Sequence, residues 1–142
     1  MKAGFNDSNG YAWIGNDQLH SLTSTGSYRL VINMWWSDEV QYSVEYKAFT
    51  VGDESSGYVL HQGGYNGTVG DCLSHNEGMK FSTDDRDTTY NPCTWYDHGS
   101  WWYYSGHGQR TYAGLNNAIS ANDGFTWSCC FMGTETMSET EM

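Results

Sequence analysis

Two stretches of regular alternation constrain the fold of this chain more than any other feature of its sequence. Apolar side chains recur at every second position through residues 27–36, and the pattern returns through residues 40–51. A period of two is typical of a half-buried β-strand. With the polar turn at 37–39 between them, the two stretches predict an antiparallel hairpin. A loop at 52–57 then leads to a short third strand at 58–61.

Other segments predict shorter elements. Residues 1–14 are rich in glycine, asparagine and serine, and we expect a loop there. Residues 16–22 begin with helix-capping types, and the spacing of Ile14, Leu19 and Leu22 predicts a short helix with one apolar face. Residues 134–142 have the length of a strand that returns to the sheet, on which Met137 and Met142 pack.

The alternation stops after Gly63-Gly64, where glycine, asparagine, aspartate, histidine and aromatic residues take over. Long irregular segments in a compact domain are usually functional or disordered, and the aromatic density argues against disorder. We therefore predict an α+β fold that forms a single domain over residues 1–142. Residues 1–66 are mainly a twisted antiparallel sheet with short helices, 67–133 a loop-rich binding lobe, and 134–142 the returning strand.

Charge excludes some classes of partner. The chain has 142 residues, which suits one domain, and carries a net charge of -11. That charge repels phosphate backbones and anionic membrane surfaces, so we expect no nucleic-acid partner. No apolar run is long enough to span a bilayer, and no secretory segment follows Met1. If the protein is exported, the signal has been removed or the sequence is a fragment.

Cysteines and sequons point outside the cell. The four cysteines, Cys72, Cys93, Cys129 and Cys130, allow three fully paired connectivities. A bond between the neighbours Cys129 and Cys130 is strained, so we favour each pairing with one of Cys72 and Cys93, in either arrangement. The alternative is four reduced cysteines in a cytosolic protein. Asn6-Asp7-Ser8 and Asn66-Gly67-Thr68 are glycosylation sequons, a signal of low specificity.

A candidate metal site precedes a dense aromatic run. Asp85 and Asp87 stand two apart in a polar segment that contains proline and asparagine and is not helical. Two such carboxylates beside backbone carbonyls make an oxygen cage of the kind that Ca²⁺ binds. The pattern is not an EF-hand, because Tyr90 and Tyr96 occupy the positions that need glycine and glutamate. A solvated acidic turn is the alternative, since two aspartates alone are a weak signal.

Several uncommon blocks resemble one family in order along the chain. They include the Trp13-Ile14-Gly15-Asn16-Asp17 block, the stretch from Tyr46 to Glu54, the stretch from Gly63 to Asp71, the stretch from His75 to Thr83, Trp101-Trp102-Tyr103 and Thr140-Glu141-Met142. These blocks resemble the fibrinogen C-terminal domain family, and this chain is similar to roughly its last two-thirds. The resemblance implies a fibrinogen C-terminal-like fold with a Ca²⁺ site beside a ligand pocket.

The resemblance also implies roles for individual residues. It places the calcium ligands at Asp85, Asp87, Thr89 and Asn91, with the first cysteine after the loop at Cys93. The family's partner cysteine falls on Gly106, so its usual disulfide cannot form here. The cis peptide that precedes that cysteine in the family would fall at Ser105-Gly106. We expect the pocket to be lined by Tyr96, Asp97, Trp102, Tyr103, Ser105, Gly106, His107, Tyr112, Asn122 and Asp123.

Three classes of function compete. The leading hypothesis is a secreted, ficolin-like lectin of innate immunity that binds acetylated sugars or bacterial cell-wall components, with aromatic walls and donors from Gly106 and His107. The alternative is a protein-interaction domain that binds a receptor or a peptide N-terminus, with Asp97 facing the ammonium group. In either case, an upstream stalk would allow oligomers. Core packing is the alternative role for Trp101 and Trp102.

Catalysis is the third class, and we expect none. Cys72, His75, Cys93 and His107 are the residue types of a zinc site, but only Cys72 and His75 have ligand spacing. No nucleophile motif accompanies them, and no poised general base is evident. Apart from His107, the histidines are expected to be structural.

Overall fold

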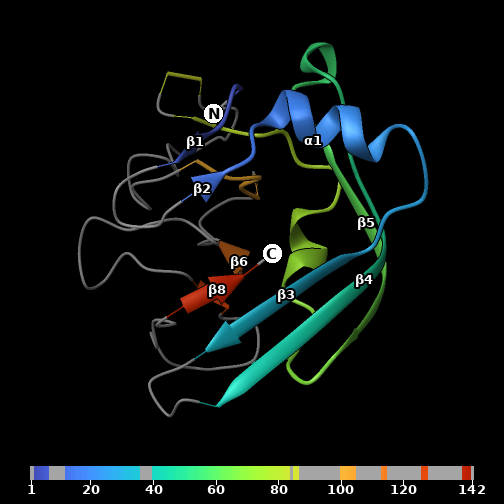
Figure 1. Cartoon of the computed structure of the whole chain (residues 1–142), viewed down its shortest axis with the longest axis vertical. Coiled ribbons are helices and arrows are strands. Elements are labelled where there is room, and N and C mark those ends of the chain that lie inside the picture. The colour runs from blue at the N-terminus through green and yellow to red at the C-terminus, as the bar shows by residue number, and fades with distance from the viewer. Residues whose placement is uncertain are drawn as a thin grey trace.

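The computed structural model describes residues 2–6, 12–35, 40–83, 85–86, 100–104, 113–114, 126–127 and 139–141. Its main element is a four-stranded antiparallel sheet in the order β5-β4-β3-β8 (Figure 1). Strand β3 is Leu30–Trp35, β4 is Gln41–Val51, β5 is Leu60–Gly67 and β8 is Glu139–Glu141. The expected α+β fold with an antiparallel sheet and short helices is therefore confirmed.

The predicted hairpin forms from β3 and β4. Leu30 lies opposite Tyr46, Ile32 opposite Val44 and Met34 opposite Tyr42. Leu30, Ile32, Met34, Val44 and Tyr46 are all buried, as the alternation predicts, while the residues between them are partly exposed. The turn at 37–39 lies outside the described residues.

The alternation of buried and exposed residues in β4 shifts by one position halfway along the strand. Val44 and Tyr46 point into the core, whereas beyond the exposed pair Lys47 and Ala48 the buried residues are Phe49 and Val51. Lys47 faces Gly64 of β5, which has a positive φ of 71°, and a Cβ there would lie 2.9 Å from the Cβ of Lys47. Glycine therefore allows the two strands to stay close where the alternation shifts.

The third strand differs from the prediction of residues 58–61. Strand β5 runs over Leu60–Gly67, so it begins later and continues past Gly63-Gly64. Tyr58 is excluded because its φ of 54° lies in the left-handed region, which residues other than glycine rarely adopt and which does not continue an extended strand. Its N–H donates to the Asp53 carbonyl at 2.9 Å in the turn that follows the 3₁₀ helix η1, Glu54–Ser56. The alternation ends at the glycines, but backbone pairing with β4 does not.

The predicted helix exists, and of its predicted apolar face only Leu19 packs against the core. Helix α1 is Asn16–Thr23 and lies across β4 (Figure 1). Ile14 and Leu22 are 45% and 47% exposed, and the buried helix residues are Asn16 and Thr23. The Thr23 hydroxyl donates to the Leu19 carbonyl at 2.8 Å and accepts the Val51 N–H at 3.1 Å. Hydrogen bonding to β4 thus decides which side of the helix turns inward.

The N-terminal segment also departs from the expected loop. Strands β1, Phe5–Asn6, and β2, Ala12–Trp13, pair antiparallel. The Trp13 ring packs on Phe81, Trp101 and Trp102, with centroid distances of 5.8, 6.2 and 6.0 Å. Contacts with rings distant in sequence therefore order a segment whose composition is that of a loop.

One hydrophobic core joins the sheet to the segments that follow it. It combines the inward residues of β3, β4 and β5 with Cys72, Leu73, Phe81, Trp101, Trp102, Tyr103 and Trp127. Leu73 begins the 3₁₀ helix η2, Leu73–Asn76, and Trp127 ends β7, Thr126–Trp127, which pairs with β6, Ala113–Gly114. None of the described helices is long and apolar enough to cross a membrane.

Candidate functional site

A two-residue bridge closes the base of the loop that carries most of the predicted site. The Ser82 N–H donates to the Trp101 carbonyl at 2.9 Å, and the Trp101 N–H donates to the Ser82 carbonyl at 3.1 Å. Ser82 is 0% exposed and Trp101 is 1% exposed. Residues 83–100 therefore leave and re-enter the core at one fixed point, which we call the loop base.

The first turn beyond the loop base holds Asp85. Thr83 and Arg86 exchange backbone hydrogen bonds of 3.2 and 2.9 Å, and the Thr83 hydroxyl donates to Oδ1 of Asp85 at 2.6 Å. This hydrogen bond, followed by one from the residue's own backbone, holds the pKa of the Asp85 carboxyl below its ordinary value. The side chain is exposed, so it presents an ionised carboxylate to solvent at neutral pH.

Asp85 has the donor chemistry that the predicted calcium site requires. Ca²⁺ prefers hard oxygen ligands, and an ionised carboxylate in an irregular turn is one of them. The other three predicted ligands, Asp87, Thr89 and Asn91, lie outside the described residues. Within the described ranges, no three histidine, cysteine, aspartate or glutamate side chains come together as a metal site. The ion remains a prediction that the chemistry of Asp85 fits.

Trp102 is held by both its side chain and its backbone. Its indole N–H donates to the Tyr58 carbonyl at 2.6 Å, and the Asn76 Nδ2 donates to the Trp102 carbonyl at 2.6 Å. Its ring also meets Phe81 and Trp101 edge-on, with centroids 4.9 and 5.1 Å away. Trp102 thus joins the turn at Tyr58, helix η2 and the loop base.

The structure places the predicted pocket residues Trp102 and Tyr103 in the core. Each is 1% exposed, so neither ring offers a face to a ligand in this arrangement. This burial agrees with the packing role considered for Trp101 and Trp102. The other predicted pocket residues lie outside the described part of the chain: Tyr96, Asp97, Ser105, Gly106, His107, Tyr112, Asn122 and Asp123.

Sequence reasoning missed Asn76, which anchors the segment beyond the loop base. Asn76 is 0% exposed, and neither its buried Oδ1 nor the buried Trp101 indole N–H has a hydrogen-bond partner among the residues that the structure describes. Burying an amide is costly unless it is hydrogen-bonded. The hydrogen bond from Asn76 Nδ2 to the Trp102 carbonyl therefore fixes the position of the Trp102 backbone. No local pattern marks Asn76, because that bond joins residues 26 apart in sequence.

The state of Cys72 argues against the zinc site that the sequence analysis considered. It immediately precedes η2, is fully buried and is disulfide-bonded. A disulfide sulfur is not a thiolate and does not ligate zinc, so the pair Cys72 and His75 does not form half of a zinc site here. Cys93, Cys129 and Cys130 lie outside the described residues, and the three connectivities stay open.

Two of the described histidines, His20 and His61, lie within hydrogen-bonding distance of a neighbouring group. Nδ1 of His20 lies 2.9 Å from the Val51 carbonyl, and Nδ1 of His61 lies 2.9 Å from Oε1 of Glu77. The other carboxylate oxygen of Glu77 accepts the Gln62 N–H at 2.6 Å and so caps part of the β5 edge. His75 is exposed. His98 and His107 fall outside the described ranges.

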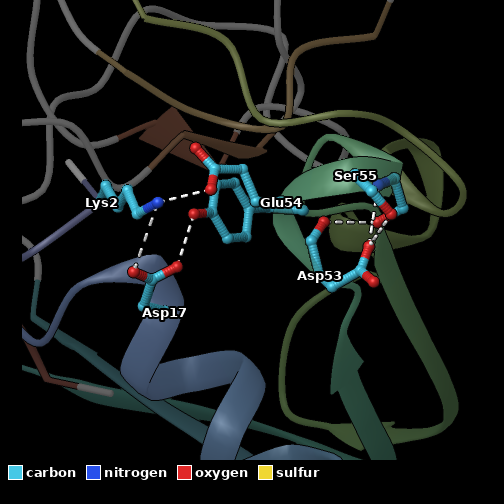
Figure 2. A network of polar contacts seen from close by, with 7 residues as sticks. Lys2, Asp17, Asp53, Glu54 and Ser55 are labelled. Atoms are coloured by element: carbon cyan, nitrogen blue, oxygen red, sulfur yellow. Dashed lines mark hydrogen bonds and ion pairs between the residues drawn. The ribbon is translucent and has the colours of Figure 1, made fainter.

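A polar network, also missed from the sequence, fastens the N-terminal segment beside Tyr58. Figure 2 shows Lys2 between Glu54 and Asp17, with Asp53 and Ser55 nearby. Asp17 also accepts the Tyr58 hydroxyl at 2.6 Å, and burial followed by this bond raises the Tyr58 pKa. The exposed ion pairs contribute little energy by themselves. Their role is to tie three segments around the strained backbone of Tyr58.

Comparison with known families finds one match over the whole chain. The sequence model of "Fibrinogen beta and gamma chains, C-terminal globular domain" matches residues 1–142. Tenascin-R of Gallus gallus is 41% identical over 108 residues, which cover 75% of this chain and 8% of that protein. Fibrinogen-like protein A of Apostichopus parvimensis is 38% identical over 109 residues, which cover 73% of this chain and 39% of the relative.

Solved structures with a similar fold are also fibrinogen-like. The fibrinogen-like globe domain of human ANGPTL6 superposes with a TM-score of 0.85 at 30% identity, over 98% of this chain and 65% of that one. Lamprey fibrin D-dimer, solved with the peptide Gly-His-Arg-Pro-amide, superposes with a TM-score of 0.77 at 23% identity. That match covers 98% of this chain and 52% of the lamprey protein's, and at this identity it shows the fold alone.

Proposed function

Because this protein belongs to the family of C-terminal globular domains of the fibrinogen beta and gamma chains, we propose that it is an extracellular recognition domain that binds a protein ligand. The contact would be made by the loop that leaves the core at Ser82 and returns at Trp101. The single observation that carries this proposal is the loop base, where a hydrogen-bonded bridge fixes both ends of an acidic and aromatic loop on a buried tryptophan pair. Binding loops on a rigid scaffold are the usual arrangement of recognition domains.

The comparisons favour a protein ligand over an acetylated sugar. Tenascin-R and the fibrinogen-like globe domain of human ANGPTL6 are among the relatives, and the lamprey fibrin D-dimer was solved with a bound peptide. The sequence resemblance placed a lectin first, and that specificity has no support among these relatives. We therefore propose the peptide- or receptor-binding alternative, with no catalytic step.

Charge supports a cationic group on the ligand. The net charge of -11 attracts positive groups and speeds their encounter with the protein. A peptide N-terminus brings an ammonium group that pairs with a carboxylate, and Asp97 is the acid we propose for that contact. Asn122 and Asp123 would assist it. Such a charge pair would also reject a peptide whose amine has been acetylated.

The disulfide at Cys72 supports an extracellular location. Disulfides persist in oxidising compartments and are rare in the cytosol. Cys72 is bonded and fully buried beside η2, so its bond is part of the folded core. We propose that the protein is secreted.

Calcium is the cofactor that we propose for the loop. Asp85, Asp87, Thr89 and Asn91 would hold it, and its bound charge would order the loop beyond the loop base. The Thr83 hydroxyl supports this role, because its hydrogen bond orients the Asp85 carboxylate and lowers the pKa of that group. The ion would act through loop order and not through contact with the peptide.

The Thr83→Val substitution should make calcium binding more sensitive to acid. The Thr83 hydrogen bond lowers the Asp85 pKa, so the carboxylate stays charged to lower pH than an ordinary aspartate. Without the hydroxyl, the pKa rises towards its ordinary value, and protons displace calcium at a higher pH. Calorimetric titrations with Ca²⁺ across the acid range should show this shift, with affinities nearly equal at neutral pH.

A matched control for Thr83→Val is Thr25→Val, which removes an exposed hydroxyl that donates to the Leu22 carbonyl at the end of α1. In the control, calcium affinity should fall with decreasing pH as it does in the wild type. If calcium affinity falls over the same pH range in all three proteins, Thr83 does not tune a metal ligand.

Paired peptides test the proposed function. We expect a peptide with a free N-terminal amine to bind in Ca²⁺, to bind at least tenfold more weakly after acetylation, and to lose affinity in EDTA. N-acetylated amino sugars should not compete. Calorimetry or fluorescence anisotropy measures each case. Competition by the acetylated sugar, with no preference for the free amine, would reverse the choice and support the lectin instead.

A further inference from the structure

The sequon Asn66-Gly67-Thr68 ends strand β5, and the structure describes all three of its residues. Asn66 lies opposite Glu45 of β4, and the neighbouring Tyr65 lies opposite Tyr46. Tyr65 packs against the core, with its ring 5.7 Å from that of Tyr46. Since side chains alternate along a strand, Asn66 is on the outer face of the sheet, and it is exposed.

The outer face at Asn66 is polar and has room for a large group. The carboxylate of the cross-strand neighbour Glu45 pairs with Arg29 at 3.3 Å. Strand β5 is an edge strand of the four-stranded sheet, so no further described strand lies beyond Asn66. A bulky substituent here would displace no packed side chain.

The other two sequon positions are held tightly. A Cβ on Gly67 would lie 2.8 Å from both the Tyr65 hydroxyl and Cγ1 of Val44, so a larger residue at the middle position would have to displace these side chains. The Thr68 hydroxyl accepts the Ser43 N–H at 3.1 Å and donates to the Ser43 carbonyl at 3.3 Å. Once β5 has paired with β4, the hydroxyl that completes the sequon is engaged within the domain.

From this arrangement we propose that Asn66 carries an N-linked glycan on the outer face of the sheet, added before β5 pairs with β4. This rests on the proposed secretion of the protein, because the sugar donor acts in the secretory pathway. Nδ2 of Asn66 forms a bond to the anomeric carbon of a lipid-diphosphate-linked oligosaccharide. The bond from that carbon to the diphosphate oxygen breaks, the lipid diphosphate leaves, and the amide nitrogen loses one proton.

The glycan would divide the molecule into two functional faces. Asn66 lies on the side of the sheet away from Tyr65 and the core, whereas the loop base belongs to the core side. The sugar would shield the outer face and the open end of β5 from association with other chains. Calcium and peptide binding at the loop should be unaffected by its removal.

Expression in cultured mammalian cells behind a cleavable secretion signal tests the proposal. Both the medium and the cell lysate are digested with peptide N-glycosidase, and peptides spanning Asn66 are analysed by mass spectrometry. We expect Asn66 to be converted to aspartate by the enzyme in the wild type. We expect no modification in Asn66→Gln or Thr68→Ala, and retained modification in Thr68→Ser, which keeps the hydroxyl.

The outcomes separate this inference from the proposed secretion. An unmodified Asn66 in protein recovered from the medium overturns the glycan. A modified Asn66 found in the lysate alone supports the glycan and contradicts secretion. The order of events has its own readout with purified oligosaccharyltransferase, which should modify the reduced, unfolded chain and leave the folded, sugar-free domain untouched. Equal modification of both forms would contradict addition before folding.

Discussion

Replacing Trp102 with alanine should remove about 3–5 kcal/mol of folding free energy, a large share of what a domain of this size has. The ring is 1% exposed and packs against Phe81 and Trp101. The substitution leaves a cavity at the centre of the core, and it also deprives the Tyr58 carbonyl of its donor. Urea unfolding followed by circular dichroism measures the loss.

The neighbouring Tyr104 provides the control for Trp102. It is 36% exposed, and Tyr104→Ala should change the unfolding free energy by no more than about 0.5 kcal/mol. Trp102→Phe keeps most of the buried area while removing the indole N–H, so it should fall between the two. A loss below about 1 kcal/mol for Trp102→Ala would mean that this ring does not hold the loop base to the sheet.

Removing the predicted calcium ligands should abolish stabilisation by the ion. A site filled at about 100 times its Kd contributes about 2.7 kcal/mol, which raises Tm on the order of 10 °C for a protein of this length. Asp85→Asn combined with Asp87→Asn removes both carboxylates that we expect to bind the ion. Differential scanning calorimetry in Ca²⁺ and in EDTA should show the rise in the wild type and none in the double variant.

The control for the calcium experiment makes the same chemical change away from the loop. Glu45→Gln converts a carboxylate to an amide on the outer face of the sheet, where its partner is Arg29. It should keep the full calcium-dependent rise in Tm, because an exposed ion pair contributes at most about 1 kcal/mol. A wild-type Tm that is identical in Ca²⁺ and EDTA would contradict the calcium site.

The local sequence pattern was sufficient to predict the fold where buried residues recur at a regular spacing along the chain. The period of two in residues 27–36 and 40–51 predicted the pairing of β3 with β4, and the inward positions Ile32, Met34 and Val44 are buried. The uncommon blocks predicted the family, which the match over residues 1–142 bears out. Calcium, its ligands and the pocket residues stay predictions, because most of them fall outside the described part of the protein.

Pattern failed where backbone conformation or a distant partner decides the outcome. Tyrosine is common in strands, but the φ of 54° at Tyr58 does not fit one. Thr23 faces inward because its hydroxyl accepts a hydrogen bond from the Val51 N–H. Tryptophan is a residue type expected in the wall of a ligand pocket, yet the Trp102 ring lies in the core.

The amino-acid sequence by itself determined the antiparallel sheet, the family and the acidic character of this protein, since each is a property of residue order or composition. Only the tertiary structure decided that Ser82 and Trp101 close the loop, and that Asn76 holds the Trp102 backbone from 26 residues away. The physical reason is that hydrogen bonds between distant segments depend on the packed core, and no period or spacing along the sequence records them.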